Sequence, residues 1–231
     1  MKTYLVLLLV FLGSISSSRG QNVVRVTDST SIDSLYREDQ FYAGLGFNLL
    51  LNRPKGIRQS GFSGGLNFGF IRDMPINKRR NVALGVGLGW SANSYGFNLL
   101  IDESQPNPVY TKLERYKSNR LSLYLIEMPL EFRWRTSTPT SYKFWRIYGG
   151  LRLGYIHYSK IKSEYEDIRL AQYNLDELER LRYGLTFTFG YNTFNFSVYY
   201  SLNSLFNGTL QDTNAPVRLN PIKVGLTFYI L

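Results

Sequence analysis

Residues 82–91 read VALGVGLGWS, and in this stretch large apolar side chains alternate with small ones. The large side chains, at every second position, are Val82, Leu84, Val86, Leu88 and Trp90. A period of two is typical of a β-strand, because successive side chains of a strand point to opposite faces. The stretch therefore predicts a strand with one broad apolar face and one face lined mainly by glycine.

Segments with the same alternation recur along the chain. They span residues 41–50, 62–71, 124–134, 145–155, 182–191, 194–202 and 222–230. Each has roughly the ten residues that a tilted strand needs to cross a membrane. Because open sheet edges are not tolerated in hydrocarbon, the pattern predicts an all-β fold, namely a closed, antiparallel, eight-stranded transmembrane β-barrel.

The apolar faces of these segments are expected to meet lipid. An eight-stranded barrel has room inside for small side chains and a few large ones, so Gly, Ser, Thr and Asn should point inward. The alternative is a soluble barrel with its apolar face inside, which would leave rows of Phe, Leu and Trp in water. Aromatic residues make up 16% of the chain while its mean hydropathy is only −0.20, and lipid-facing strands reconcile these two values.

The first twenty residues have the features of a secretory signal peptide. Lys2 precedes an apolar run at 4–12, and Ser18 and Gly20 occupy positions −3 and −1 of a cleavage site before Gln21. The alternative is a retained membrane anchor, but this run is too short to span roughly 30 Å of hydrocarbon. We expect a signal peptide at 1–20, a flexible periplasmic leader at 21–40 and the barrel at 41–231.

The connections between the predicted strands alternate in length. The shorter ones are 72–81, 135–143 and 192–193, and the longer, more polar ones are 51–61, 102–119, 161–180 and 203–219. Short periplasmic turns and longer extracellular loops are the habit of outer-membrane barrels. The sequence therefore predicts a single barrel domain in the outer membrane of a Gram-negative cell, with both ends of the chain in the periplasm.

The net charge is +10 at pH 7, and removal of Lys2 and Arg19 with the signal peptide lowers it by two to +8. Such a charge can indicate nucleic-acid binding, but export and the scatter of the basic residues argue against that partner. We expect outer-membrane lipids and other outer-membrane or periplasmic proteins as partners. Zero cysteines and a single histidine, His157, exclude the usual zinc sites, so no metal or cofactor is predicted.

Several charged residues lie on the inward face of the predicted strands. They are Glu127, Glu131, Arg133, Arg146, Arg152, Arg182 and Lys223. A symmetrical turn between the fourth and fifth strands would place Glu127 opposite Arg152. It would also place Arg133 opposite Arg146, with Glu131 diagonal to both, and pairing of opposite charges would offset part of the cost of burial. The network could form an ion path or a ligand site, but a plug of salt bridges suits so narrow a lumen better.

The single histidine has two interpretations. His157 falls near the outer end of its strand and faces outward, with Ser159 expected on the same side. This His-x-Ser spacing is similar to that of the lipid A deacylases, in which His157 would be the base for a Ser159 nucleophile. None of the nearby carboxylates matches a motif that would complete the unit, so an interfacial histidine is favoured. The expected membrane-interface anchors are Trp90, Trp134, Trp145 and Tyr155.

Residues 123–139 read LYLIEMPLEFRWRTSTP, and residues 142–160 read YKFWRIYGGLRLGYIHYSK. A strand with a Glu-x-Pro-Leu core, then a short turn and a glycine-rich strand, resembles the PorT-like outer-membrane β-barrel proteins of the Bacteroidetes. Named members of that family are linked to type IX protein secretion and gliding, and many others have no assigned role. The resemblance implies a fold and a location more firmly than an activity.

These features favour a non-enzymatic integral barrel that serves as a structural or accessory subunit of an outer-membrane protein complex. The reason is that the sequence offers no complete catalytic set and no metal site. A lipid A-modifying enzyme that uses His157 and Ser159 is the second hypothesis, and a narrow pore is the third.

Overall fold

The computed structural model describes residues 39–103, 108–136 and 144–230, and the regular structure in these ranges is β-strand. The strands are β1 (Gln40–Leu51), β2 (Gly64–Pro75), β3 (Val82–Gly96), β4 (Leu99–Asp102), β5 (Val109–Lys112), β6 (Ser118–Arg135), β7 (Trp145–Tyr165), β8 (Ile168–Tyr173), β9 (Leu181–Tyr191), β10 (Phe194–Ser201) and β11 (Asn220–Ile230). Within the described ranges no helix has the length and apolarity of a membrane span. The predicted signal peptide and nearly all of the predicted leader lie outside them.

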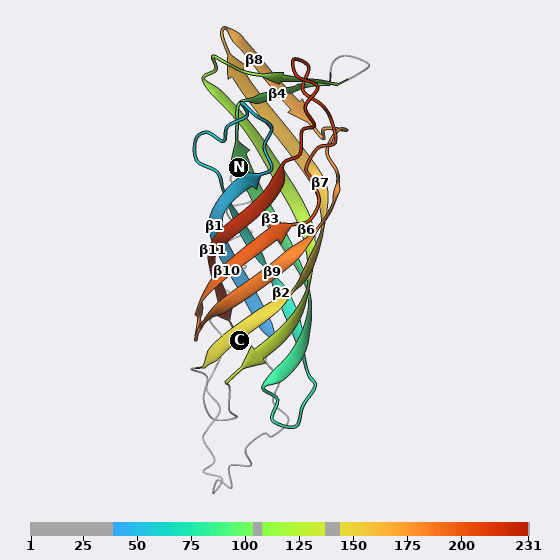
Figure 1. The fold of residues 1–231 in the computed structure, drawn as a ribbon. Helices are drawn as coiled ribbons and strands as arrows, with labels where there is room; N and C mark the ends of the chain where they lie inside the picture. Colours follow the sequence, from blue (N-terminus) through green and yellow to red (C-terminus); the bar gives the residue numbers. More distant parts are fainter. Residues whose placement is uncertain (1–38, 104–107, 137–143, 231) are drawn as a thin grey trace, which may run out of the picture. The chain divides into compact units, whose positions relative to one another are not determined.

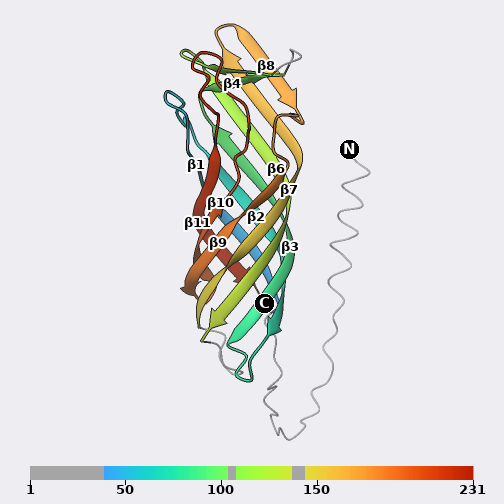
Figure 2. The same cartoon turned by 45° about the vertical axis from the view of Figure 1, so that its right-hand side comes forward.

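Eight of the strands close into an antiparallel barrel (Figure 1 and Figure 2). Around the wall the order is β1, β2, β3, β6, β7, β9, β10 and β11, and β11 pairs back onto β1 with Phe41 opposite Ile230. Closure gives hydrogen-bond partners to backbone groups that would otherwise form two open edges, as a sheet in lipid requires. The prediction of a closed eight-stranded barrel is confirmed.

Short turns join the strands at one end of the barrel. Asn192 and Thr193 alone connect β9 to β10, and Asn192 has a φ of 54°, which tight hairpin turns require and asparagine tolerates. Residues 76–81 connect β2 to β3. The opposite end carries the longer connections, so by the habit of outer-membrane barrels the short turns face the periplasm and the loops face outward.

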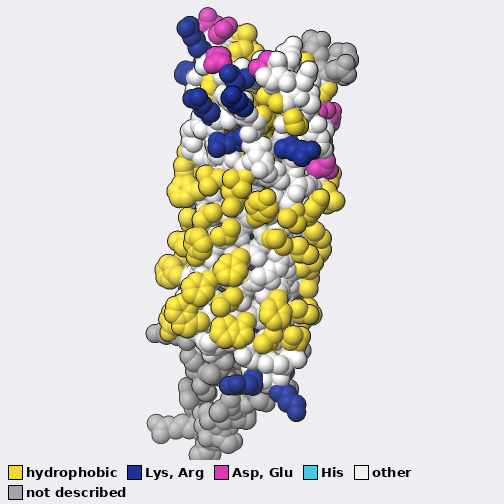
Figure 3. Space-filling view, viewed as in Figure 1, with side chains coloured by type: hydrophobic (Ala, Val, Ile, Leu, Met, Phe, Trp, Pro, Cys, Tyr) yellow, Lys and Arg dark blue, Asp and Glu magenta, His cyan; other side chains and the backbone are white. Residues whose placement is uncertain are grey.

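The outer surface of the wall is a band of large apolar side chains (Figure 3). Phe41 and Leu88 are 62% and 65% exposed, and the side chains that alternate with such residues on the inner face are small or polar. Gly89 shows how crowded the inner face is, because the Tyr42 hydroxyl occupies the position that a Cβ at Gly89 would need. Soluble proteins rarely expose apolar patches beyond a few hundred Å². The band therefore faces lipid.

Strand β6 passes from one environment to another along its length. Between Glu127 and Arg135 its inward side chains are mostly charged and its outward ones apolar, as expected inside a membrane. Beyond Tyr124, towards the loops, the faces exchange character, so that Leu121 is buried inside and Arg120 faces outward. Water replaces lipid outside this part of the wall, and apolar side chains move inside. The exchange places the outer boundary of the membrane near Tyr124.

The long connections fold into a cap at the loop end, which we define as residues 97–103, 108–117, 166–180 and 202–219. It contains β4, β5 and β8, beyond the barrel wall in Figure 1. The core beneath and within it consists of Leu50, Ile57, Tyr95, Phe97, Leu99, Ile101, Tyr110, Leu121, Leu123, Leu125, Ile156, Ile161, Leu175, Leu178, Leu205, Phe206, Leu210, Val217 and Leu219. The sequence did not predict this core, because single apolar residues scattered among the polar ones converge only when the loops pack.

Phe206→Ala tests this core. Phe206 is fully buried with its ring centre 6.1 Å from that of Tyr110, so the substitution should destabilise the cap by about 3–5 kcal/mol through the cavity it leaves. Protease added to intact cells should cleave the cap of the variant at lower concentrations, while the barrel keeps its heat-modifiable gel migration. Phe194→Ala removes a ring from the lipid-facing wall and should leave protease resistance unchanged. Equal resistance of F206A and the wild type would contradict the packed core.

Candidate functional site

Several charged side chains of the lumen contact Glu127, which is 3% exposed. Its Oε1 accepts hydrogen bonds from Ser91 Oγ at 2.8 Å and from Lys223 Nζ at 3.3 Å. Its Oε2 accepts a hydrogen bond from Arg152 Nη1 at 3.3 Å. These partners come from β3, β11 and β7, so the cluster ties three parts of the wall to β6. A carboxylate at this depth needs such partners, since desolvation of an unpaired charge is strongly unfavourable.

A second cluster lies nearer the short turns and centres on Asp73. Asp73 Oδ1 accepts hydrogen bonds from Arg133 Nη1 and Arg135 Nη1, both at 2.8 Å, and Oδ2 accepts one from Arg135 Nη2 at 2.8 Å. Arg133 also donates to Gln40, and its Nε lies 3.8 Å from Glu131 Oε2. Both arginines are 0% exposed, so the ion pairs are fully desolvated.

Sequence reasoning placed Asp73 and Arg135 in short turns and so missed them. The strands continue past their apolar stretches, β2 to Pro75 and β6 to Arg135. Both charged residues keep the inward parity of their strands, and that parity was the available signal. Their mutual pairing stabilises the extension, because either charge alone would be buried without a partner.

The register between β6 and β7 differs by two residues from the predicted one. Glu127 lies opposite Gly154 rather than Arg152. Arg133 likewise lies opposite Tyr148, two residues beyond its predicted partner. The ion pair of Glu127 with Arg152 nevertheless forms along a diagonal, which long side chains can span.

Each lumen glutamate lies between two glycines on the neighbouring strands, so no cation stands directly beside it. The flanking residues are Gly89 and Gly154 for Glu127, and Gly85 and Gly150 for Glu131. The interior of an eight-stranded barrel has room for small side chains and only a few large ones. Glycine makes room for each carboxylate, which then reaches a cation further along the wall.

Basic groups outnumber carboxylates among the described lumen residues. Some of the additional basic side chains contact aromatic rings or carbonyl oxygens. Arg146 lies opposite Arg135, and its guanidinium carbon is 4.2 Å from the centre of the Phe144 ring. Arg182 donates a hydrogen bond to the backbone carbonyl oxygen of Asn203 at 2.7 Å. Ring faces and carbonyl oxygens attract a cation without adding another buried ion.

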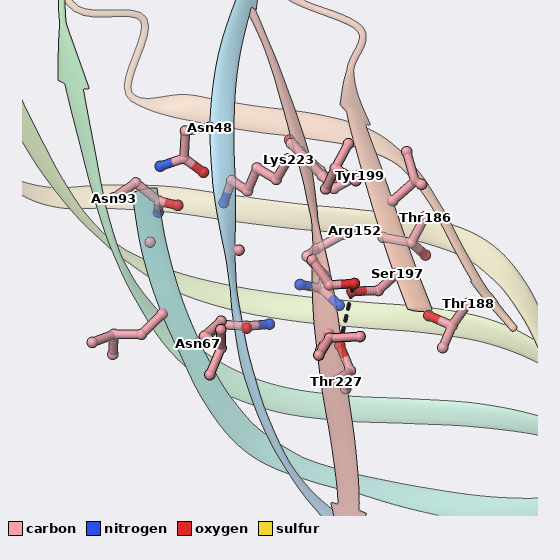
Figure 4. Close-up of a pocket in the computed structure, with 18 residues that line it drawn as sticks. Asn48, Asn67, Asn93, Arg152, Thr186, Thr188, Ser197, Tyr199, Lys223 and Thr227 are labelled. Atoms are coloured by element: carbon pink, nitrogen blue, oxygen red, sulfur yellow. Dashed lines mark hydrogen bonds between the residues drawn. The ribbon is translucent and has the colours of Figure 1, made fainter. Parts of the chain in front are cut away.

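A small polar cavity lies beside the Glu127 cluster (Figure 4). The labelled residues that line it are Asn48, Asn67, Asn93, Arg152, Thr186, Thr188, Ser197, Tyr199, Lys223 and Thr227. In its wall, Thr227 Oγ1 on β11 and Ser197 Oγ on the neighbouring β10 are hydrogen-bonded at 3.0 Å. Its volume is about 50 Å³, which holds a few water molecules. The cavity is therefore a polar chamber in a filled lumen.

The structure separates His157 from Ser159. A β-bulge where β7 passes Leu125 changes the parity of the strand between them. His157 faces outward, and its Nε2 accepts a hydrogen bond from Trp90 Nε1 at 3.1 Å. Ser159 is 2% exposed, and its Oγ accepts a hydrogen bond from the backbone N–H of Leu175 at 3.0 Å. The expectation that the two side chains share a face is wrong, and they do not form a nucleophile–base pair.

The aromatic residues expected at the interfaces, Trp90, Trp134, Trp145 and Tyr155, are all on the outer wall. Trp90 belongs to a row of rings, with its ring centre 5.4 Å from that of Phe68 and 5.8 Å from that of Tyr124. The row lies where the faces of β6 exchange character, the level that suits amphipathic rings. Anchoring by these residues stays a prediction. The described residues contain no group of three or more His, Asp or Glu able to hold a metal ion.

A comparison with protein families agrees with this architecture. The family described as "Outer membrane protein beta-barrel domain" matches residues 20–207. The solved structure of Ail, the attachment invasion locus protein of Yersinia pestis, is similar with a TM-score of 0.33 and 12% sequence identity. That similarity covers 85% of this chain and 100% of the Ail chain. No curated protein sequence matches.

Asp73→Asn tests the cluster that centres on Asp73. The variant leaves two buried guanidinium groups beside a neutral amide, so the free energy of unfolding should fall by about 3–5 kcal/mol. Asp176→Asn is the matched control, because Asp176 is exposed, lies 3.8 Å from the guanidinium of Arg180, and such surface pairs contribute about 0–1 kcal/mol. Urea unfolding in detergent micelles, followed by tryptophan fluorescence, measures both. Equal losses in the two variants would show that Asp73 does not hold the cluster together.

Proposed function

Because the chain belongs to the family of outer-membrane proteins with a β-barrel domain, we propose that it is a non-enzymatic accessory subunit of an outer-membrane protein complex. The observation that carries this proposal is a lumen filled by ion pairs beneath a cap with an apolar core. A barrel filled in this way has its outer wall and its cap as working surfaces.

Hydrogen bonds within the cap hold its surface in one arrangement. Tyr110 Oη donates to Glu177 Oε2 at 2.8 Å, and burial together with this hydrogen bond raises the pKa of Tyr110. The Glu103 carboxylate accepts hydrogen bonds from the backbone N–H groups of Asp176 and Glu177 at 3.2 Å and 3.0 Å. A preorganised surface loses little conformational entropy on binding, which favours recognition of a partner protein.

The finer part of the proposal is a role in type IX protein secretion or gliding. Its support is the resemblance of residues 123–160 to the PorT-like proteins of the Bacteroidetes. Two residues of the Glu-x-Pro-Leu core point into the lumen, where Glu127 is the centre of a cluster and Pro129 lies opposite Arg152. The motif thus serves the interior of the barrel, and a secretion partner would contact the cap or the outer wall.

The geometry gives less support to the two alternatives. A lipid A-modifying enzyme would need His157 and Ser159 together, and they lie on opposite sides of the wall. A narrow pore would need more open lumen than a cavity of about 50 Å³.

Photo-crosslinking tests the accessory role. A photoreactive amino acid in place of Ile168, which is exposed at the tip of the β7–β8 hairpin, should capture one specific envelope protein in living cells. The same amino acid in place of Leu88, exposed in the middle of the lipid-facing band, should give no such product. Mass spectrometry of the adducts identifies the partner. No protein adduct at either position, with the barrel folded in the membrane, would count against the proposal.

The non-enzymatic part is tested through lipid A. Cells that overproduce the wild type, His157→Gln or Ser159→Ala should have identical lipid A in mass spectra, because the two side chains cannot act as one unit in this geometry. An acyl chain that is missing only from the wild-type cells would overturn the proposal in favour of a deacylase.

A further inference from the structure

The lipid-facing wall contains a hollow near its loop end. It has a volume of about 380 Å³ and lies over β1, β2, β3 and β6. Its lining includes the small residues Gly64, Ala92, Ser94 and Ser122 and the rings of Phe62 and Tyr124. Large apolar side chains cover most of the band, and this hollow interrupts it, as does another over β7, β9 and β10.

The strand register explains how the hollow arises. Ala92 on β3 lies between Leu66 on β2 and Tyr124 on β6, and Ser94 lies opposite Ser122 two residues nearer the loops. Small outward side chains therefore coincide on neighbouring strands. In a membrane such a hollow must be filled by lipid, because a void would forfeit van der Waals contacts along its whole length.

Two basic side chains lie on the loop side of the hollow. Arg120 is the next outward residue of β6 beyond the hollow, and it lies directly opposite Lys162 on β7. Like charges that face one another across strands repel. The outward carboxylate nearest along β7, Glu164, is already shared by Lys117 and Arg169 at 3.2 Å each. In the described part of the chain Arg120 and Lys162 thus have no carboxylate to balance them.

A third cation lies beside this pair. Lys160, opposite Ser122 of the hollow, has its Nζ 4.9 Å from the centre of the Tyr173 ring. On the face drawn in Figure 3, basic side chains likewise gather directly above the apolar band. Cations just beyond the aromatic row are at the level of lipid headgroups, where they attract anionic groups.

We infer that the hollow, together with Arg120 and Lys162, binds one lipid A moiety of the outer leaflet. An acyl chain lies in the hollow, and a lipid A phosphate lies between the two cations and supplies the missing negative charge. Hydrogen bonds from guanidinium and ammonium groups to phosphate are charge-assisted and therefore strong. Lipid A fits because it carries phosphates on the extracellular side, where the loops lie. No bond is made or broken, and the inference is independent of the accessory role.

Native mass spectrometry of the detergent-purified protein with added bisphosphorylated lipid A tests the headgroup site. Arg120→Gln with Lys162→Gln should weaken binding about thirtyfold, from the usual contribution of two interfacial cations. Lys78→Gln with Arg79→Gln removes the same charges from the exposed turn at the opposite end and should leave binding unchanged. Binding by R120Q/K162Q as tight as by the wild type would overturn the inference.

The acyl-chain part has its own test. Ser122→Phe fills the hollow but keeps both cations, and it should weaken binding about tenfold, the equivalent of roughly two methylene groups left unburied. With the wild type, dephosphorylated lipid A should bind as weakly as lipid A binds to R120Q/K162Q. Two results with the wild type would overturn the assignment even if a variant failed to fold. One is that phosphatidylglycerol binds as tightly as lipid A, and the other is that dephosphorylated lipid A binds as tightly as the phosphorylated form.

Discussion

The lumen of an eight-stranded barrel has room for small side chains and only a few large ones, and the interior of this protein is arranged around that limit. Glu127 and Glu131 each lie between glycines on the two neighbouring strands. The cations that Glu127 contacts are Arg152, on a diagonal of β7, and Lys223 on β11, whereas Glu131 lies near Arg133 of its own strand. Of the other arginines, Arg146 lies against the Phe144 ring and Arg182 donates a hydrogen bond to a backbone carbonyl oxygen. A cavity of about 50 Å³ lies beside the Glu127 cluster, and the proposed function uses the outer surfaces.

A second constraint is that the same strands cross two solvents. Within the membrane β6 has apolar residues outside and charges inside, and beyond Tyr124 the arrangement is reversed. The reversal supplies the apolar core on which the cap folds, and it turns Ser159 inward through a β-bulge. It also places Arg120 and Lys162 on the outer wall directly above an apolar hollow. The cap and the proposed lipid A site are thus two consequences of one boundary.

The strands of the wall and their lipid-facing sides could be predicted because alternation reports the environment of both faces of a strand. The register between β6 and β7 could not be predicted, since the residues of the connecting turn carry no periodic pattern. Nor could the cap, whose apolar residues, such as Phe206 and Leu210, are spaced irregularly and converge only in the folded state. Asp73 and Arg135 could have been found by extending the inward parity of their strands past the last apolar residue.

The central claim is that the charged lumen is a structural filling and that the protein acts through its outer surfaces. Current measurements on the folded wild-type protein in planar lipid bilayers, in concentrated potassium chloride, test this claim most directly. We expect that insertion of the barrel leaves the current at the level of the protein-free bilayer, because ion pairs occupy the lumen and the cavity beside them is small. Discrete, lasting conductance steps that appear with each inserted barrel would contradict it.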